Sequence, residues 1–133
     1  MQKTILLVDD EPHVIRILRM ALERENYQVL SAYNGEMALD ILAENSPDIV
    51  ISDIDMPRMD GRELCRQIQD RYPNRNFFII ILTSRAERDH RDWASQIPNL
   101  EFLEKPVSVK NLKSILEKIF IANKAPNEPT TNR

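Results

Sequence analysis

The chain has 133 residues, of which 42% are hydrophobic and 29% charged, so it is long enough for one globular domain with a substantial core. A net charge of −3 gives no reason to expect nucleic acid or an anionic membrane as a partner of this domain. No apolar stretch reaches membrane-spanning length, the first apolar strand leaves no room for a signal peptide, and Cys65 has no second cysteine to pair with. We therefore expect a cytoplasmic protein in a reducing compartment.

Short apolar runs alternate with helix-like patterns along the chain. Strands are expected at residues 4–8, 28–32, 49–53, 78–82 and 100–103, and helices at about 12–22, 37–44, 60–72, 86–96 and 108–120. Such alternation is typical of repeated βαβ units, so we predict an α/β fold with a doubly wound, five-stranded parallel sheet. From Asn123 onward the chain is polar, which indicates one domain at 1–122 followed by a tail or the start of a linker at 123–133.

Glycine occurs only at Gly35 and Gly61. The Gly-rich dinucleotide fingerprint and the Walker phosphate loop both need clustered glycines, because the backbone must approach a phosphate closely. This count argues against a nucleotide- or flavin-binding version of the fold.

Polar side chains stand where the expected strands end. Asp9 and Asp10 follow the first strand, Asp53 ends the third, Thr83 follows the fourth and Lys105 follows the fifth. In an open parallel sheet, ligands bind beyond the carboxyl ends of the strands. These residues therefore indicate one site at that edge of the sheet.

Three carboxylates in little space repel one another unless a cation pairs with them. Oxygen ligands without His or Cys suit Mg²⁺ or Mn²⁺. Such a metal, together with Lys105, would neutralise a phosphoryl group arriving at a carboxylate, and aspartate is a known nucleophile for phosphoryl transfer. Thr83 could donate a hydrogen bond to the same group. The pattern predicts phosphoryl chemistry at an aspartate.

Each of these residues also has an ordinary structural interpretation. An Asp at a strand end commonly caps a helix or forms a turn, a Lys before Pro is commonly a surface residue, and a Thr closing a strand fits β propensity. The acidic pair followed by Glu11 could simply favour the N-terminus of the first helix. The joint occurrence at successive strand ends favours the functional interpretation.

The motifs resemble those of one family. They are Leu6-Leu7-Val8-Asp9-Asp10-Glu11, Ser52-Asp53 with Met56-Pro57 and Asp60-Gly61, Leu82-Thr83-Ser84, and Phe102-Leu103-Glu104-Lys105-Pro106. From about Lys3 to Ala122 the chain resembles the receiver domain of two-component response regulators, and it is similar to the chemotaxis-type single-domain regulators. The resemblance implies a (βα)5 flavodoxin-like fold with strand order 2-1-3-4-5.

The resemblance also implies roles for individual residues. Asp53 would accept a phosphoryl group from a sensor histidine kinase, a phosphotransfer protein or a small phosphodonor. Mg²⁺ would be bound by the carboxylates of Asp10 and Asp53, by the backbone carbonyl of Asp55, and by Asp9 mostly through water. The protein would be a signalling phosphoacceptor, with self-phosphorylation and slow autodephosphorylation as its only activities.

A switch is implied as well. Lys105 would pair with the phosphoryl oxygens, Thr83 would move toward the phosphoryl group, and Phe102 would turn inward. Phe102 has no hydroxyl, where Tyr is common in the family. The motion would change the face formed by the fourth helix, fifth strand and fifth helix, where a downstream protein or effector domain binds or a homodimer forms. Trp93, on the fourth helix, is expected to pack under that helix.

Two alternatives remain open. A haloacid-dehalogenase-like phosphohydrolase would use Asp53-Ile54-Asp55 as its D-x-D motif, but that motif normally opens the fold, whereas Asp9-Asp10 comes first here and Pro57 stands where Thr or Val is usual. A degenerate receiver acting as a constitutive binding module would have no physical need for the complete set of acids, Thr83 and Lys105.

Overall fold

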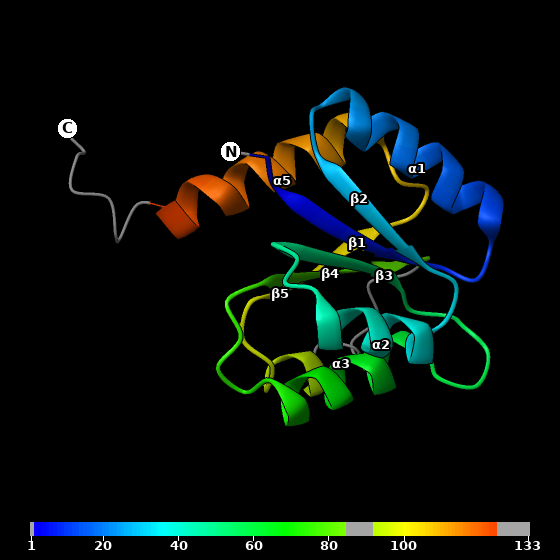
Figure 1. The fold of residues 1–133 in the computed structure, drawn as a ribbon, viewed down its shortest axis with the longest axis vertical. Coiled ribbons are helices and arrows are strands. Elements are labelled where there is room, and N and C mark those ends of the chain that lie inside the picture. Colours follow the sequence, from blue (N-terminus) through cyan, green and yellow to red (C-terminus); the bar gives the residue numbers. More distant parts are fainter. Residues whose placement is uncertain (1, 85–91, 125–133) are drawn as a thin grey trace.

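The computed structural model describes residues 2–84 and 92–124, which form a five-stranded sheet flanked by helices (Figure 1). The elements are β1 Thr4–Val8, α1 Pro12–Arg24, β2 Gln28–Ala32, α2 Gly35–Glu44, β3 Ile49–Asp53, α3 Gly61–Arg71, β4 Phe78–Thr83, β5 Leu100–Glu104 and α5 Val109–Lys124. All strand pairs are parallel, in the order β2-β1-β3-β4-β5. The predicted fold class and strand order are confirmed.

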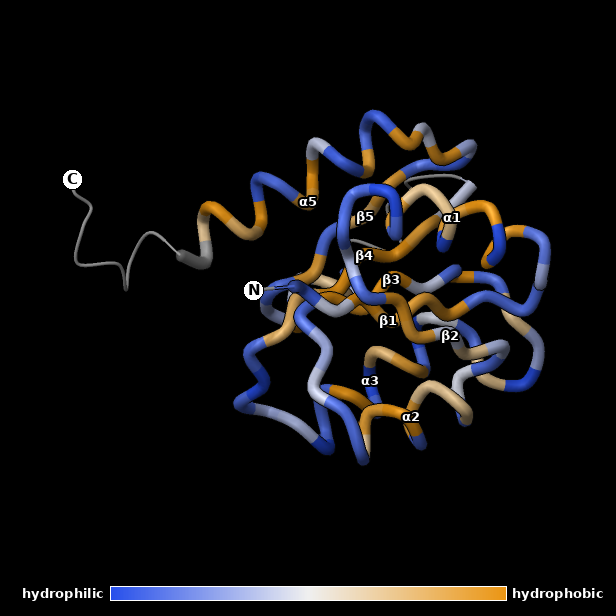
Figure 2. Tube along the Cα trace, turned by 45° about the horizontal axis from the view of Figure 1, so that its top comes forward, coloured by the Kyte–Doolittle hydropathy of each residue, from blue (hydrophilic) through white to orange (hydrophobic). Residues whose placement is uncertain are grey.

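The sheet is buried on both faces. Helices α1 and α5 cover one face and α2 and α3 the other (Figure 1). Successive side chains of β3 therefore enter different cores: Ile49 and Ile51 pack with α1 and α5, whereas Val50 packs with α2 and α3. This explains why the central strands are continuous apolar runs, which Figure 2 shows as the hydrophobic centre of the trace. Every residue of β3 is buried, whereas β5, at the edge, is half-buried or exposed.

Local signals in the sequence set the starts of the helices. Pro12 occupies the first turn of α1, where a missing backbone N–H costs nothing. The side chains of Asn34 and Asp60 cap α2 and α3 by accepting hydrogen bonds from the backbone N–H groups of Met37 at 2.7 Å and Glu63 at 2.8 Å. The Asn34 cap makes α2 begin at Gly35, two residues before the predicted start.

Replacing Asn34 with Ala is expected to lower the free energy of unfolding by about 1 kcal/mol, because one N-terminal N–H of α2 loses its partner. Urea unfolding measures this change. The exposed Asn74 provides a control, since Asn74→Ala removes the same amide outside any helix. An Asn34→Ala variant as stable as Asn74→Ala would show that the cap contributes nothing.

Part of the predicted fourth helix lies outside the described residues. Of the expected range 86–96, the structure describes 92–96, and residues 92–94 are helical. The predicted domain limit at residue 122 lies in the last turn of α5, and residues 125–133 of the expected tail are outside the described residues. Within residues 2–84 and 92–124, no helix is both long enough and apolar enough to cross a membrane.

Candidate functional site

The carboxyl ends of the strands bring the predicted polar residues to one edge of the sheet. Asp53 ends β3, Asp9 directly follows the neighbouring β1, and Thr83 ends β4 on the other side of β3. Asp9 and Asp53 are each only 4% exposed, and Thr83 is 2% exposed. Buried polar groups are costly, so their presence together at one sheet edge points to a site.

Three carboxylates lie close together at this edge. Asp9, Asp10 and Asp53 each offer an oxygen atom, and these atoms lie within 4.8 Å of one another. Asp9 Oδ1 accepts a hydrogen bond from the Glu11 N–H at 2.9 Å, whereas the buried Oδ2 has no hydrogen-bond partner among the described residues. An all-oxygen set with an unsatisfied oxygen fits a hard cation such as Mg²⁺.

Lys105 supplies the positive charge of the site. Its Nζ lies 2.6 Å from Asp53 Oδ1. Its backbone N–H donates to the Thr83 carbonyl at 2.7 Å, which ties the chain after β5 to the end of β4, and the following peptide bond, Lys105–Pro106, is cis. Burial disfavours the charged amine, yet the hydrogen bond and charge of Asp53, with the charges of Asp9 and Asp55, raise its pKa overall. Lys105 therefore stays protonated next to Asp53.

Both buried carboxyls are disfavoured as anions. Burial raises the pKa of Asp53, and the charge of Asp55 adds to this effect, while Lys105 opposes it. Burial also raises the pKa of Asp9, with a contribution from the nearby Asp53, while the Glu11 N–H opposes it. A cation bound between these groups would relieve this electrostatic strain.

The remaining predicted residues lie around this centre. The Asp55 side chain is exposed, yet it is close enough to act electrostatically on Asp53 and Lys105. Phe102 is half-buried on β5, where it pairs with Ile81 of β4. Since alternate residues of a strand share a face, Phe102 lies on the same face of the sheet as Ile81 and Thr83.

Two contacts of the site region were missed by the sequence analysis. The Trp93 ring meets the Phe102 ring edge-on, with centroids 5.7 Å apart and planes at 84°. Gly61 packs against the backbone at the end of β3: a Cβ at this position would lie 2.7 Å from the Asp53 carbonyl oxygen. A lone Trp in a helical pattern carries no signal for its partner. The Asp60-Gly61 pair indicated the start of a helix and belonged to the family motifs, but it carried no signal for a close approach to the Asp53 backbone.

Comparisons with known proteins agree with this geometry. The model of the response regulator receiver domain family matches residues 5–117. A response regulator, GtcR of Aneurinibacillus migulanus, is 35% identical over 106 residues, which is 80% of this chain and 43% of that protein. The chain thus spans less than half the length of this relative.

Solved structures show the same fold. Response regulator TrrA of Thermotoga maritima, in complex with Mg²⁺-BeF, has a TM-score of 0.77 at 31% identity, covering 89% of this chain and 99% of that one. A receiver domain protein of Clostridium thermocellum has a TM-score of 0.80 at 30% identity, covering 92% and 97%.

The chain belongs to the response regulator receiver domain family of two-component signalling, and its fold is CheY-like. Members of this family are signalling phosphoacceptors and generally not true enzymes. They bind Mg²⁺ at an acidic pocket, which fits the Asp9, Asp10 and Asp53 cluster. They interact with histidine kinases or phosphotransfer proteins and with downstream effectors.

Proposed function

We propose that this receiver is switched by phosphorylation of Asp53, in a reaction that requires Mg²⁺. The observation that carries the proposal is the buried Asp53 carboxylate, with the Lys105 ammonium at 2.6 Å and two further carboxylates beside it. A purely structural ion pair would not need Asp9 and Asp10 next to it, because they add repulsion.

In the proposed reaction, an Asp53 carboxylate oxygen attacks the phosphorus of the donor. A P–O bond to Asp53 forms while the bond between phosphorus and the donor's leaving group breaks. Lys105 pairs with the phosphoryl oxygens, and the Thr83 hydroxyl donates a hydrogen bond to one of them. Mg²⁺, held by Asp10, Asp53 and the Asp55 carbonyl and by Asp9 through water, would supply neutralisation of the phosphoryl charge.

The proposal includes the switch and its partners. Thr83 moves toward the phosphoryl group, Phe102 turns inward, and the face made by residues 92–97, β5 and α5 is re-shaped for a downstream protein, an effector domain or a second copy of the chain. The donor is a sensor histidine kinase or a phosphotransfer protein. The domain limit at residue 122, the tail at 123–133 and the cytoplasmic location remain predictions.

Intact-protein mass after incubation with acetyl phosphate tests the proposal. We expect a single phosphoryl adduct that forms with Mg²⁺, fails to form with a chelator, and is absent from Asp53→Asn. Asp40→Asn serves as the control, because it removes one exposed carboxylate from α2 and leaves the site intact. Circular dichroism verifies that all three proteins are folded.

Other results would favour the alternatives. A folded protein that forms no adduct in any condition would indicate a constitutive binding module. Steady release of phosphate from a broad set of phosphomonoesters would instead indicate a phosphohydrolase, whose nucleophile turns over with such substrates. An adduct that persists in Asp53→Asn would place the acceptor elsewhere.

A further inference from the structure

Three side chains from separate elements stack in a row beside the switch region. Arg62, in the first turn of α3, places its guanidinium carbon 6.0 Å from the centroid of the Trp93 ring. The Trp93 ring in turn meets the edge of Phe102 on β5. The row therefore connects α3 to the strand that carries the switch residue, through a single indole ring.

Both contacts have favourable geometry. Edge-to-face ring pairs at this separation are attractive beyond the area they bury, and an arginine within about 6 Å of a Trp centroid is a cation–π contact. Trp93 and Phe102 are half-buried and pack on the same core as α2 and α3. These contacts stabilise the edge-to-face arrangement of the Phe102 and Trp93 rings.

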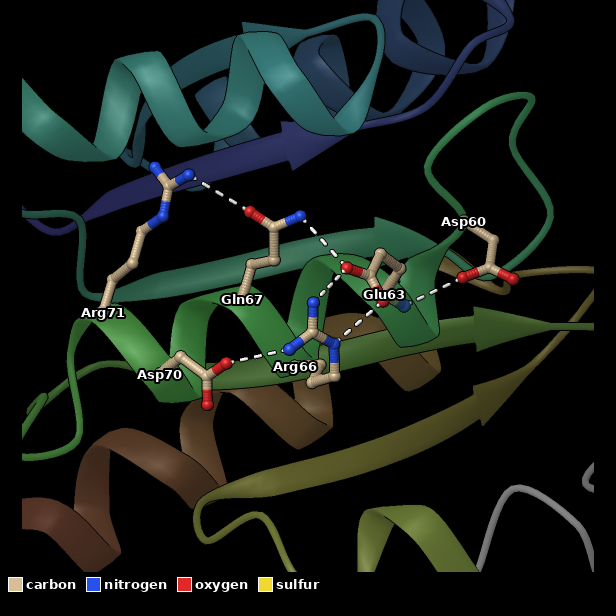
Figure 3. A network of polar contacts seen from close by, with 6 residues as sticks. All are labelled: Asp60, Glu63, Arg66, Gln67, Asp70 and Arg71. Carbon is tan, nitrogen blue, oxygen red and sulfur yellow. Dashed lines mark hydrogen bonds and ion pairs between the residues drawn. The ribbon is translucent and has the colours of Figure 1, made fainter.

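Arg66, one turn further along α3, makes its contacts within its own helix. Arg66 donates to Glu63 and Asp70, and Gln67 also donates to Glu63, all within α3 (Figure 3). The hydrogen bonds from Arg66 and Gln67 lower the pKa of Glu63 to about 2. This network belongs to one helix, whereas the Arg62 contact reaches another element.

Space for movement lies next to the indole. A cavity of about 780 Å³ opens between α3 and residues 92–97, with Arg62, Trp93 and Ile97 in its lining. Phe102 shares its face of the sheet with Thr83, so an inward turn of Phe102 toward Thr83 moves its ring and breaks the present edge-on geometry with Trp93. The packing of the indole against Phe102 then changes at a place where the indole has room to shift.

We propose that Trp93 is a positioning residue that transmits the position of Phe102 to α3 through Arg62, so that the groove between α3 and residues 92–97 changes with phosphorylation. The inference rests on the proposed function, since it needs the Phe102 movement. Phosphorylation would then change two surfaces: the face made by residues 92–97, β5 and α5, and the groove between α3 and residues 92–97. An interaction that stabilises the Arg62–Trp93–Phe102 stack favours the arrangement before phosphorylation. It therefore shifts the equilibrium away from the phosphorylated arrangement.

Tryptophan fluorescence tests the first link, because the chain contains one Trp. With acetyl phosphate and Mg²⁺, we expect the emission maximum to move to longer wavelength and acrylamide quenching to increase in proportion to the adduct, measured by mass on the same sample. In Phe102→Leu we expect no change in tryptophan emission or quenching per mole of adduct, because the ring that touches Trp93 is gone. Phe102→Tyr keeps the ring and restores the response.

Phosphorylation rates test the second link. Removing the cation–π contact in Arg62→Ala is expected to speed adduct formation about two- to fivefold, since the contact stabilises only the starting arrangement. Arg62→Lys keeps a cation, so its rate of adduct formation is expected to lie closer to that of the wild type. Arg71→Ala is the matched control, because it removes the same charge from α3 at a residue bonded to Gln67.

The outcomes separate the two proposals. A complete adduct with unchanged tryptophan emission would overturn the inference and leave the proposed function standing. So would an equal response per adduct in Phe102→Leu and the wild type, or equal rates in Arg62→Ala and Arg71→Ala. Absence of any adduct would overturn the proposed function, and the inference with it.

Discussion

Replacing Asp9 with Asn is expected to make the protein more stable at neutral pH and to weaken its stabilisation by Mg²⁺. The Asp9 carboxyl is buried beside Asp10 and Asp53, burial raises its pKa, and its Oδ2 has no hydrogen-bond partner among the described residues. A neutral amide avoids the cost of a buried anion and keeps an oxygen for the Glu11 N–H. The gain is on the order of 1–2 kcal/mol, seen by urea unfolding with and without Mg²⁺.

The pH dependence of this gain has a definite sign. A folded-state pKa above the usual value of 3.8 means that the protonated Asp9 stabilises the fold at low pH, and that this contribution is lost as pH rises through the folded-state pKa. The advantage of Asp9→Asn over the wild type is therefore absent below about pH 3.8, grows as pH rises, and becomes constant once the pH exceeds the folded-state pKa of Asp9. The Asp40→Asn control should show neither the gain nor the loss of Mg²⁺ response. A less stable Asp9→Asn at pH 7 would contradict the electrostatic account of the site.

A second large effect is expected from Gly61→Ala. The new Cβ would lie 2.7 Å from the Asp53 carbonyl oxygen and 2.9 Å from the Ile54 Cα, so backbone rather than a side chain must move. Overpacking of this kind costs about 1–3 kcal/mol. The displaced backbone carries Asp53, so we also expect phosphorylation by acetyl phosphate to slow about tenfold or more. Urea unfolding and adduct formation measure the two effects.

Gly35→Ala is the matched control. The Cβ there would meet the Met59 side chain, with the sulfur at 2.5 Å, and a methionine can change rotamer. Gly35 and Gly61 are each the first residue of their helix, so the two substitutions change helix propensity in the same way. Equal losses of stability and of phosphorylation rate in the two variants would show that the backbone contact of Gly61 has no special importance.

Much of the fold could be predicted from the sequence because the strands are short apolar runs with polar ends. The predicted strand limits differ from β4 and β5 by one residue each, at Thr83 and Glu104, because polar residues continue the ladder where the apolar pattern stops. The strand order came from the family resemblance, since alternation of strands and helices fixes the parallel class but not which strands are neighbours.

The candidate site was predictable to a similar degree. Asp9, Asp10, Asp53 and Lys105 were expected together because parallel strands place their carboxyl ends at one edge, and the structure brings them together. The contact between Trp93 and Phe102 could not be predicted, because it joins two elements whose relative placement depends on packing.

The strands differ in burial, so the central strand β3 is more tightly held than the edge strand β5. Strand β3, which carries Asp53, lies between β1 and β4 with every residue buried, so it cannot shift without opening two cores. Strand β5 has a neighbour on one side only and is nowhere fully buried. Under the proposed phosphorylation of Asp53, strand β3 would stay in place and the displacement would be taken up at β5. The same sequence that buries the strand of Asp53 on both faces leaves β5, at the edge next to β4, less constrained.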